Sequence, residues 1–64
     1  MTDQTAQTKA RYNAELYRLA LALYMGETPH NMEGFIAAAA EAFNVPTEKM
    51  QRDTLKKYHA HFVI

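Results

Sequence analysis

Two short breaks divide this 64-residue chain into three stretches of strong helix formers. The first break, residues 26–29, begins with a glycine suited to the left-handed end of a helix. It closes with a Thr-Pro pair suited to capping and starting the next helix, with Asn31 as the alternative cap. The second break, residues 44–46, ends in a proline that suits the first turn of a third helix. The predicted helices cover residues 9–25, 29–43 and 46 to at least 58.

The pattern of breaks predicts a small all-α domain of three helices that spans residues 1–64. Residues 1–8 are polar and have no hydrophobic period, so we expect a frayed lead-in there. A chain this short buries only about 60% of its unfolded surface, and without cysteine it has no disulfide to compensate. Association with a second chain is the remaining source of stability. We find no signal peptide or membrane-spanning stretch, which favours a cytoplasmic protein.

The first predicted helix carries two apolar stripes side by side. At about 100° per residue, one stripe consists of Tyr12, Leu16, Leu19 and Leu23. The second stripe consists of Tyr17, Leu21, Tyr24 and Met25, extended by Ala10 and Ala14. A surface helix of a monomer normally has a single apolar face. We therefore assign the first stripe to the core and the second to contact with another chain, either a second copy in a homodimer or a host protein.

The second and third predicted helices form a helix-turn-helix-like pair over about residues 36–55. The first helix of this pair is rich in alanine, which allows close packing, and Ala40 is the small residue at which the two helices touch. Phe43 and Val45 flank the turn, and Met50 is the buried residue of the last helix. In helix-turn-helix proteins the second helix of the pair enters the major groove of DNA.

The segment V-P-T-E-K-M-Q-R-D, residues 45–53, resembles the recognition-helix segment of DeoR-type bacterial repressors, which commonly reads V-S-x-x-T-I-x-R-D-L. The matching residues are Val45, Met50 and the pair Arg52-Asp53. The departures are Asn44 in place of Gly, Pro46 in place of the capping Ser, Lys49 in place of Thr, and Thr54 before Leu55. Together with the helix-turn-helix-like pair over about residues 36–55, the resemblance covers about a third of the chain. It implies a DNA-binding regulator of the kind that phages and plasmids encode.

Basic residues gather on one side of the third predicted helix. On a helical wheel this sector holds Lys49, Arg52, Lys56 and His59, roughly opposite Leu55, Tyr58 and Phe62. Gln51 and Arg52 can read base edges, and lysines can hold phosphates. The predicted DNA contacts are therefore Lys49, Gln51, Arg52, Lys56 and His59. The alternative is an ordinary solvated helix face, since seven basic and seven acidic side chains leave the chain with no net charge.

The residues give no support to catalytic or metal chemistry. The chain lacks Cys and Ser, has no Gly-rich phosphate loop, and has no acidic pair beside a histidine. His59 and His61 are two residues apart and point in different directions on a helix, and His30 is distant in the sequence. We therefore expect a protein that is not an enzyme and that uses no catalytic residue, metal or cofactor.

Three functional hypotheses follow from these patterns. The first is a small DNA-binding transcriptional regulator that contacts double-stranded DNA as a homodimer, with the second stripe as the dimer contact. The second is a small inhibitor or adaptor that docks on a host protein through the same stripe. The third is a helical oligomer with a purely structural role. We place the first hypothesis ahead of the second.

Overall fold

The computed structural model of the chain consists of three α-helices. It describes the backbone of residues 2–63 and the side chains of residues 7–63. The helices are α1 (Thr2–Tyr24), α2 (Pro29–Phe43) and α3 (Thr47–His61), and the described residues contain no strand. The predicted all-α fold of three helices is confirmed.

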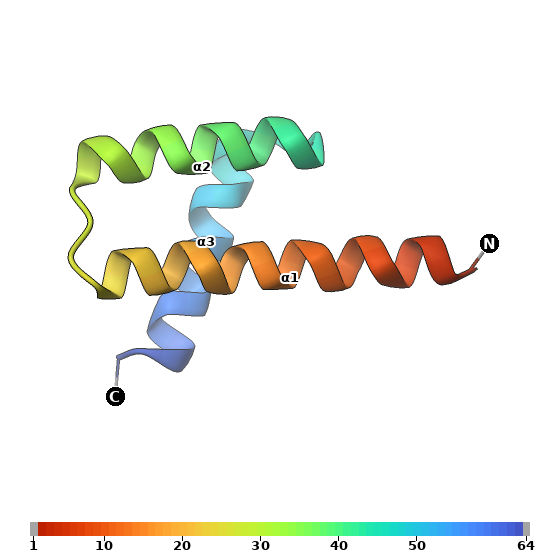
Figure 1. Cartoon of the computed structure of the whole chain (residues 1–64), viewed down its shortest axis with the longest axis horizontal. Helices are drawn as coiled ribbons and strands as arrows, with labels where there is room; N and C mark the ends of the chain where they lie inside the picture. The colour runs from red at the N-terminus through yellow and green to blue at the C-terminus, as the bar shows by residue number, and fades with distance from the viewer. Residues whose placement is uncertain (1, 64) are drawn as a thin grey trace.

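The three helices form a pair with one helix laid across it. α1 and α2 lie side by side and run in opposite directions, and α3 crosses both of them on one side of the pair (Figure 1). The C-terminal end of α3 passes beyond α1 on the side away from α2. The N-terminal part of α1 extends beyond α2. This arrangement places α3 against the rest of the chain along one side only.

Capping residues at the two breaks fix where the helices end. Thr28 Oγ1 accepts a hydrogen bond from the backbone N–H of Asn31 at 3.2 Å, so Thr28 rather than Asn31 is the cap of α2. Gly26 has a φ of 94°, the positive value predicted for a glycine after a helix. Asn44 also has a left-handed backbone, with φ 57° and ψ 46°, and its N–H bonds to carbonyls in the last turn of α2. The turn into α3 therefore depends on a residue that tolerates positive φ.

Two helix starts differ from the prediction. α1 begins at Thr2, whereas the pattern predicted a start at residue 9 after a frayed lead-in; Met1 lies outside the described residues. Gln7 and Thr8 are polar and exposed, so this part of the chain carries no hydrophobic period by which a helix could be predicted. At the second break, Pro46 is the N-cap residue and α3 begins one position later.

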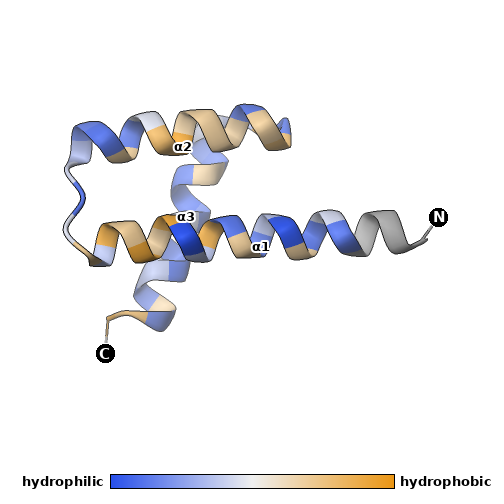
Figure 2. Ribbon diagram, viewed as in Figure 1, coloured by the Kyte–Doolittle hydropathy of each residue, from blue (hydrophilic) through white to orange (hydrophobic). Residues whose placement is uncertain are grey.

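Side chains from all three helices meet in one core. The buried residues are Leu16, Leu19 and Ala20 of α1, Met32, Ile36, Ala39 and Ala40 of α2, and Met50 and Thr54 of α3. Tyr12 and Leu23 pack half-buried against this core, which confirms the first stripe of α1 as the core stripe. Figure 2 shows hydrophobic residues along α2 and the C-terminal half of α1, whereas α3 is mostly hydrophilic. Among the described residues of α3, Met50 and Thr54 are the side chains buried in this core.

The left-handed backbone of Asn44 leads to a first prediction. In this conformation the Cβ of an L residue lies close to a carbonyl oxygen, at a cost of about 1 kcal/mol. The short polar side chain of asparagine can offset this cost through local hydrogen bonds, alanine cannot, and glycine has no Cβ. We expect Asn44→Ala to lower the free energy of unfolding by about 1 kcal/mol and Asn44→Gly to change it by only a few tenths. Urea denaturation followed by circular dichroism measures both. Equal losses in the two variants would mean that the side chain, and not the backbone conformation, stabilises the turn.

The buried hydroxyl of Thr54 leads to a second prediction. Thr54 is 1% exposed, and its Oγ1 has no hydrogen-bond partner among the described residues. An unpaired buried hydroxyl costs about 1–3 kcal/mol, and valine has nearly the same shape without it. We expect Thr54→Val to raise the free energy of unfolding by about 1 kcal/mol in the same urea titration. Thr47→Val, at an exposed position of α3, is the matched control and should bring no gain. A destabilised Thr54→Val variant would contradict the expectation.

Candidate nucleic-acid interface

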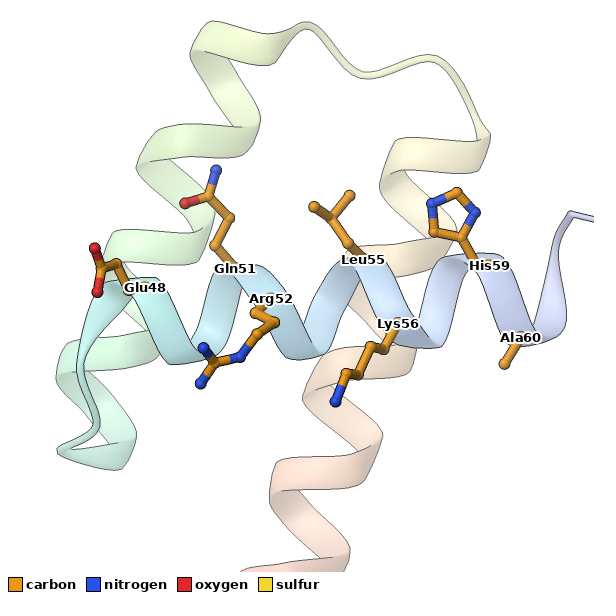
Figure 3. A pocket seen from close by; sticks show the side chains of 7 residues that line it. All are labelled: Glu48, Gln51, Arg52, Leu55, Lys56, His59 and Ala60. Carbon is orange, nitrogen blue, oxygen red and sulfur yellow. The ribbon is translucent and has the colours of Figure 1, made fainter.

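The side of α3 that points away from the core is exposed, and we call it the outer face. Met50 and Thr54 occupy the core side of the helix, so the residues opposite them stay in solvent. Figure 3 shows this surface with α1 and α2 behind α3. The outer face consists of Glu48, Gln51, Arg52, Leu55, Lys56, His59 and Ala60.

Four of the five predicted DNA contacts lie together on the outer face. They are Gln51, Arg52, Lys56 and His59, and all four are exposed. Arg52 and Lys56 project from one edge of α3, one turn apart, whereas Gln51 and His59 project from the other edge (Figure 3). The outer face therefore presents a row of cations beside a row of side chains that can form directional hydrogen bonds.

Lys49, the fifth predicted contact, points elsewhere. Its Nζ donates a hydrogen bond to Asp53 Oδ2 at 2.8 Å and lies 5.0 Å from the centroid of the Tyr12 ring. The hydroxyl of Tyr12 donates to the same carboxylate oxygen at 2.6 Å, so one carboxylate joins α1 to α3. A phosphate contact by Lys49 would compete with this pairing.

The three groups of this cluster change each other's proton affinity. Hydrogen bonds from Lys49 and then from Tyr12 lower the pKa of Asp53, because both favour the charged carboxylate. Burial raises the pKa of the Tyr12 hydroxyl, and its bond to Asp53 raises it further. The bond to Asp53 also raises the pKa of Lys49. At neutral pH the cluster is therefore a charged pair with a neutral phenol, which suits a structural link between helices.

Leu55 lies on the outer face, so the prediction that it faces away from the basic sector is wrong. Residues three apart on an α-helix are about 60° apart around the axis, which puts Leu55 beside Arg52. The side chain of Leu55 is 44% exposed. Tyr58 and Phe62, predicted on the same apolar sector, are half-buried. The outer face therefore combines cations with an exposed aliphatic side chain.

The charge of the outer face is weakly positive. The outer face contains two cations, Arg52 and Lys56, and one carboxylate, Glu48, which lies in the first turn of α3. Among the described residues, the recorded ion pairs are one within α1 and the pair Lys49–Asp53. Arg52 and Lys56 therefore have their charges open to solvent and to an anionic ligand.

The second stripe of α1 is exposed, and the C-terminal residues partly cover it. Tyr17, Leu21, Tyr24 and Met25 are all exposed. Phe62 stacks on Tyr24, with ring centroids 5.1 Å apart, and packs against Tyr17 at 5.3 Å. The sequence left the path of the C-terminal residues open, because no local pattern links them to the first helix.

The histidines do not come together. His59 belongs to the outer face, whereas the ring of His61 lies 5.6 Å from that of Tyr17. Across the part of the chain that the structure describes, no three His, Asp or Glu side chains are grouped as metal ligands would be. Over the same residues, no helix has the length and apolar character needed to cross a membrane.

Comparisons of the chain with models of protein families, with curated proteins and with solved structures gave no significant match. Two surfaces of the described residues are candidates for a functional contact. One is the outer face of α3, and the other is the second stripe of α1.

The carboxylate shared by Tyr12 and Lys49 leads to a third prediction. The pKa of Asp53 is lower in the folded chain than in the unfolded one. Its bonds therefore stabilise the fold above the unfolded pKa of about 3.8, and this contribution is lost as the pH falls through the folded pKa. Tyr12→Phe removes one bond to the charged group. We expect it to lower the free energy of unfolding by about 1–2 kcal/mol at pH 7, and by progressively less as the pH falls below about 4.

Urea titrations at pH 7 and pH 3 measure this difference. Tyr24→Phe is the matched control, since Tyr24 is exposed at the surface. The control should show the same small effect at both pH values. A loss in Tyr12→Phe that does not depend on pH would contradict a role for the Asp53 carboxylate.

Proposed function

We propose that this protein is a small DNA-binding transcriptional regulator of phage or plasmid type that acts in the cytoplasm as a homodimer. The observation that carries the proposal is the outer face of α3, an uncovered helix surface with Gln51, Arg52 and Lys56 on neighbouring turns. The major groove of DNA admits an α-helix, and helix-turn-helix proteins present such a helix after a short turn. α2, the three residues 44–46 and the crossing helix α3 are compatible with this mode of binding (Figure 1).

Five side chains of the outer face have a suitable partner on DNA. Gln51 can pair with the N6 and N7 positions of adenine, and Arg52 with the O6 and N7 positions of guanine. Lys56 and His59 suit phosphate oxygens. Leu55, an exposed aliphatic side chain between them, supplies the apolar contact that distinguishes a thymine methyl. Each of the two rows of the outer face thus holds one base-reading side chain, Gln51 or Arg52, and one phosphate-contacting side chain, His59 or Lys56.

The neutral net charge limits how tightly one copy can bind. Two unpaired cations per copy let a dimer neutralise about four phosphates. Counterion release then predicts an affinity that falls about a hundredfold between 50 and 200 mM salt. A monomer would lose roughly half of these contacts. The homodimer therefore belongs to the proposal, because two half-sites supply the charge that one copy lacks.

The second stripe of α1 favours one alternative, a small inhibitor or adaptor that docks on a host protein. Tyr17, Leu21, Tyr24 and Met25 remain exposed, and an apolar helix face of this kind can lie in a groove of a partner. That function needs the stripe and is indifferent to Arg52 and Lys56. The regulator needs both surfaces, so variants of the outer face separate the two functions.

Charge removal on the outer face gives a fourth prediction. We expect Arg52→Ala and Lys56→Ala each to weaken binding of a mixed-sequence duplex about tenfold at low salt, because each removes a phosphate or base contact. Fluorescence anisotropy measures the affinity, and circular dichroism and sedimentation check that fold and oligomeric state are unchanged. Arg11→Ala, which removes an exposed cation from α1, is the matched control and should bind like the wild type.

An amide-shift titration by NMR locates the contact. Shifts should concentrate on residues 47–59 and weaken as the salt concentration rises. A wild-type chain that shows neither binding nor shifts at low salt would contradict the proposed function. That result would favour the alternative function, in which the second stripe of α1 binds a host protein.

A further inference from the structure

Exposed residues on α1 follow the spacing of a helix-pairing surface, which we call the outer seam. The outer seam consists of Ala10, Ala14, Tyr17, Leu21 and Tyr24, which are separated by four, three, four and three residues. All of them are exposed. This alternation is the heptad pattern by which two helices pack in a left-handed supercoil. The buried residues of α1 lie on a different side of the helix, so the core does not use the outer seam.

The outer seam is narrow at its N-terminal end and bulky at its C-terminal end. In an antiparallel pair, heptad layers can set Ala10 against Leu21 of a second copy and Ala14 against Tyr17 of the second copy. Each bulky side chain then meets a small one, so the layers fill evenly. A parallel pair would stack Tyr17 on Tyr17 of the second copy and would leave the alanines facing each other across a gap. The size gradient therefore favours the antiparallel arrangement.

Contacts within the chain prepare the bulky end of the outer seam. Phe62 packs against both Tyr17 and Tyr24, which restricts the two rings and reduces the entropy that a partner would have to remove. Arg18 lies beside the outer seam and is paired with Glu15 on the same helix, so its charge is already compensated.

We infer that the outer seam pairs α1 with α1 of a second copy of this chain, antiparallel and with two-fold symmetry. Such a contact uses the same surface on both copies and closes after two. The inference rests on the homodimer of the proposed function and gives that dimer its interface and direction. It does not depend on DNA binding.

The exposed area of the outer seam sets the strength of the pair. Tyr17 is 47% exposed, Tyr24 is 57% exposed and the neighbouring Met25 is 75% exposed. Covering these side chains together with Leu21 buries on the order of 400 Å² per copy. A standard interface buries about 800 Å² per partner. The dimer is therefore a weak one that dissociates on dilution.

Sedimentation of the full chain without DNA tests the pairing. The wild type should change from monomer to dimer between micromolar and millimolar concentrations. Leu21→Glu places a carboxylate in the outer seam and should raise the dissociation constant at least about tenfold. Phe35→Glu is the matched control, because it puts the same charge at a similarly exposed apolar position of α2, 39% exposed against 42% for Leu21. The control should dimerise like the wild type.

Two outcomes of this experiment overturn the inference. One is a wild-type chain that remains monomeric at millimolar concentration, which would leave the stripe to a host protein. The other is a dimer that Phe35→Glu weakens as much as Leu21→Glu does. Circular dichroism checks that each variant keeps its helices. Arg52→Ala should dimerise normally, so a failed dimer and a failed DNA contact are distinguished by separate measurements.

The direction of the pair is tested with cysteines, which the natural chain lacks. Ala10 and Leu21 are about 16 Å apart along one helix, too far for a disulfide within the chain. Ala10→Cys combined with Leu21→Cys should therefore form a covalent dimer on oxidation if the helices are antiparallel. Ala10→Cys alone should stay monomeric on a non-reducing gel. Efficient crosslinking of Ala10→Cys alone would indicate a parallel pair and overturn the proposed direction.

Discussion

The packing of α3 across the other two helices determines which side chains this protein exposes to a partner. α3 is mostly hydrophilic, and its fully buried side chains are Met50 and Thr54. Tyr12 and Lys49 add a polar link by sharing the carboxylate of Asp53. A shift of α3 by one residue would turn every side chain by about 100° and move the cations of the outer face toward the core. The candidate DNA surface is therefore a consequence of the contacts that the opposite side of α3 makes with α1 and α2.

Sequence reasoning succeeded where the controlling interactions are local. The cap at Thr28 and the positive φ of Gly26 depend on neighbouring residues alone, so the residue types at the breaks predict them. The core stripe of α1 was also predictable, because burial on one side of a helix leaves a regular period in the sequence. The start of α1 was not, because the polar residues before residue 9 show no such period in the sequence.

The candidate site was predicted only in part, because its details depend on contacts between distant segments. The position of Leu55 was predicted on the wrong side of α3, because the prediction used the pattern of charges. The burial of Met50 and Thr54 determines the actual orientation of the helix. Lys49 shares the basic sector in sequence, yet Tyr12 of another helix completes a cluster that holds it. The packing of Phe62 on two tyrosines of α1 likewise joins the two ends of the chain. The partners in these contacts are far apart in the sequence, so no local pattern predicts them.

The two proposed surfaces are each weak, and their weakness has a common physical origin. A chain of 64 residues with no net charge has little area to spare for an obligate interface and few cations to spare for phosphates. In the proposed assembly, however, the binding free energies of two half-sites would act together, so a dimer would hold DNA far more tightly than either copy alone. Because the proposed dimer would form only as concentration rises, occupancy of a two-part site would grow steeply with the amount of protein. A small neutral regulator of the proposed kind would thus gain a sharp response to its own abundance from two contacts that are individually modest.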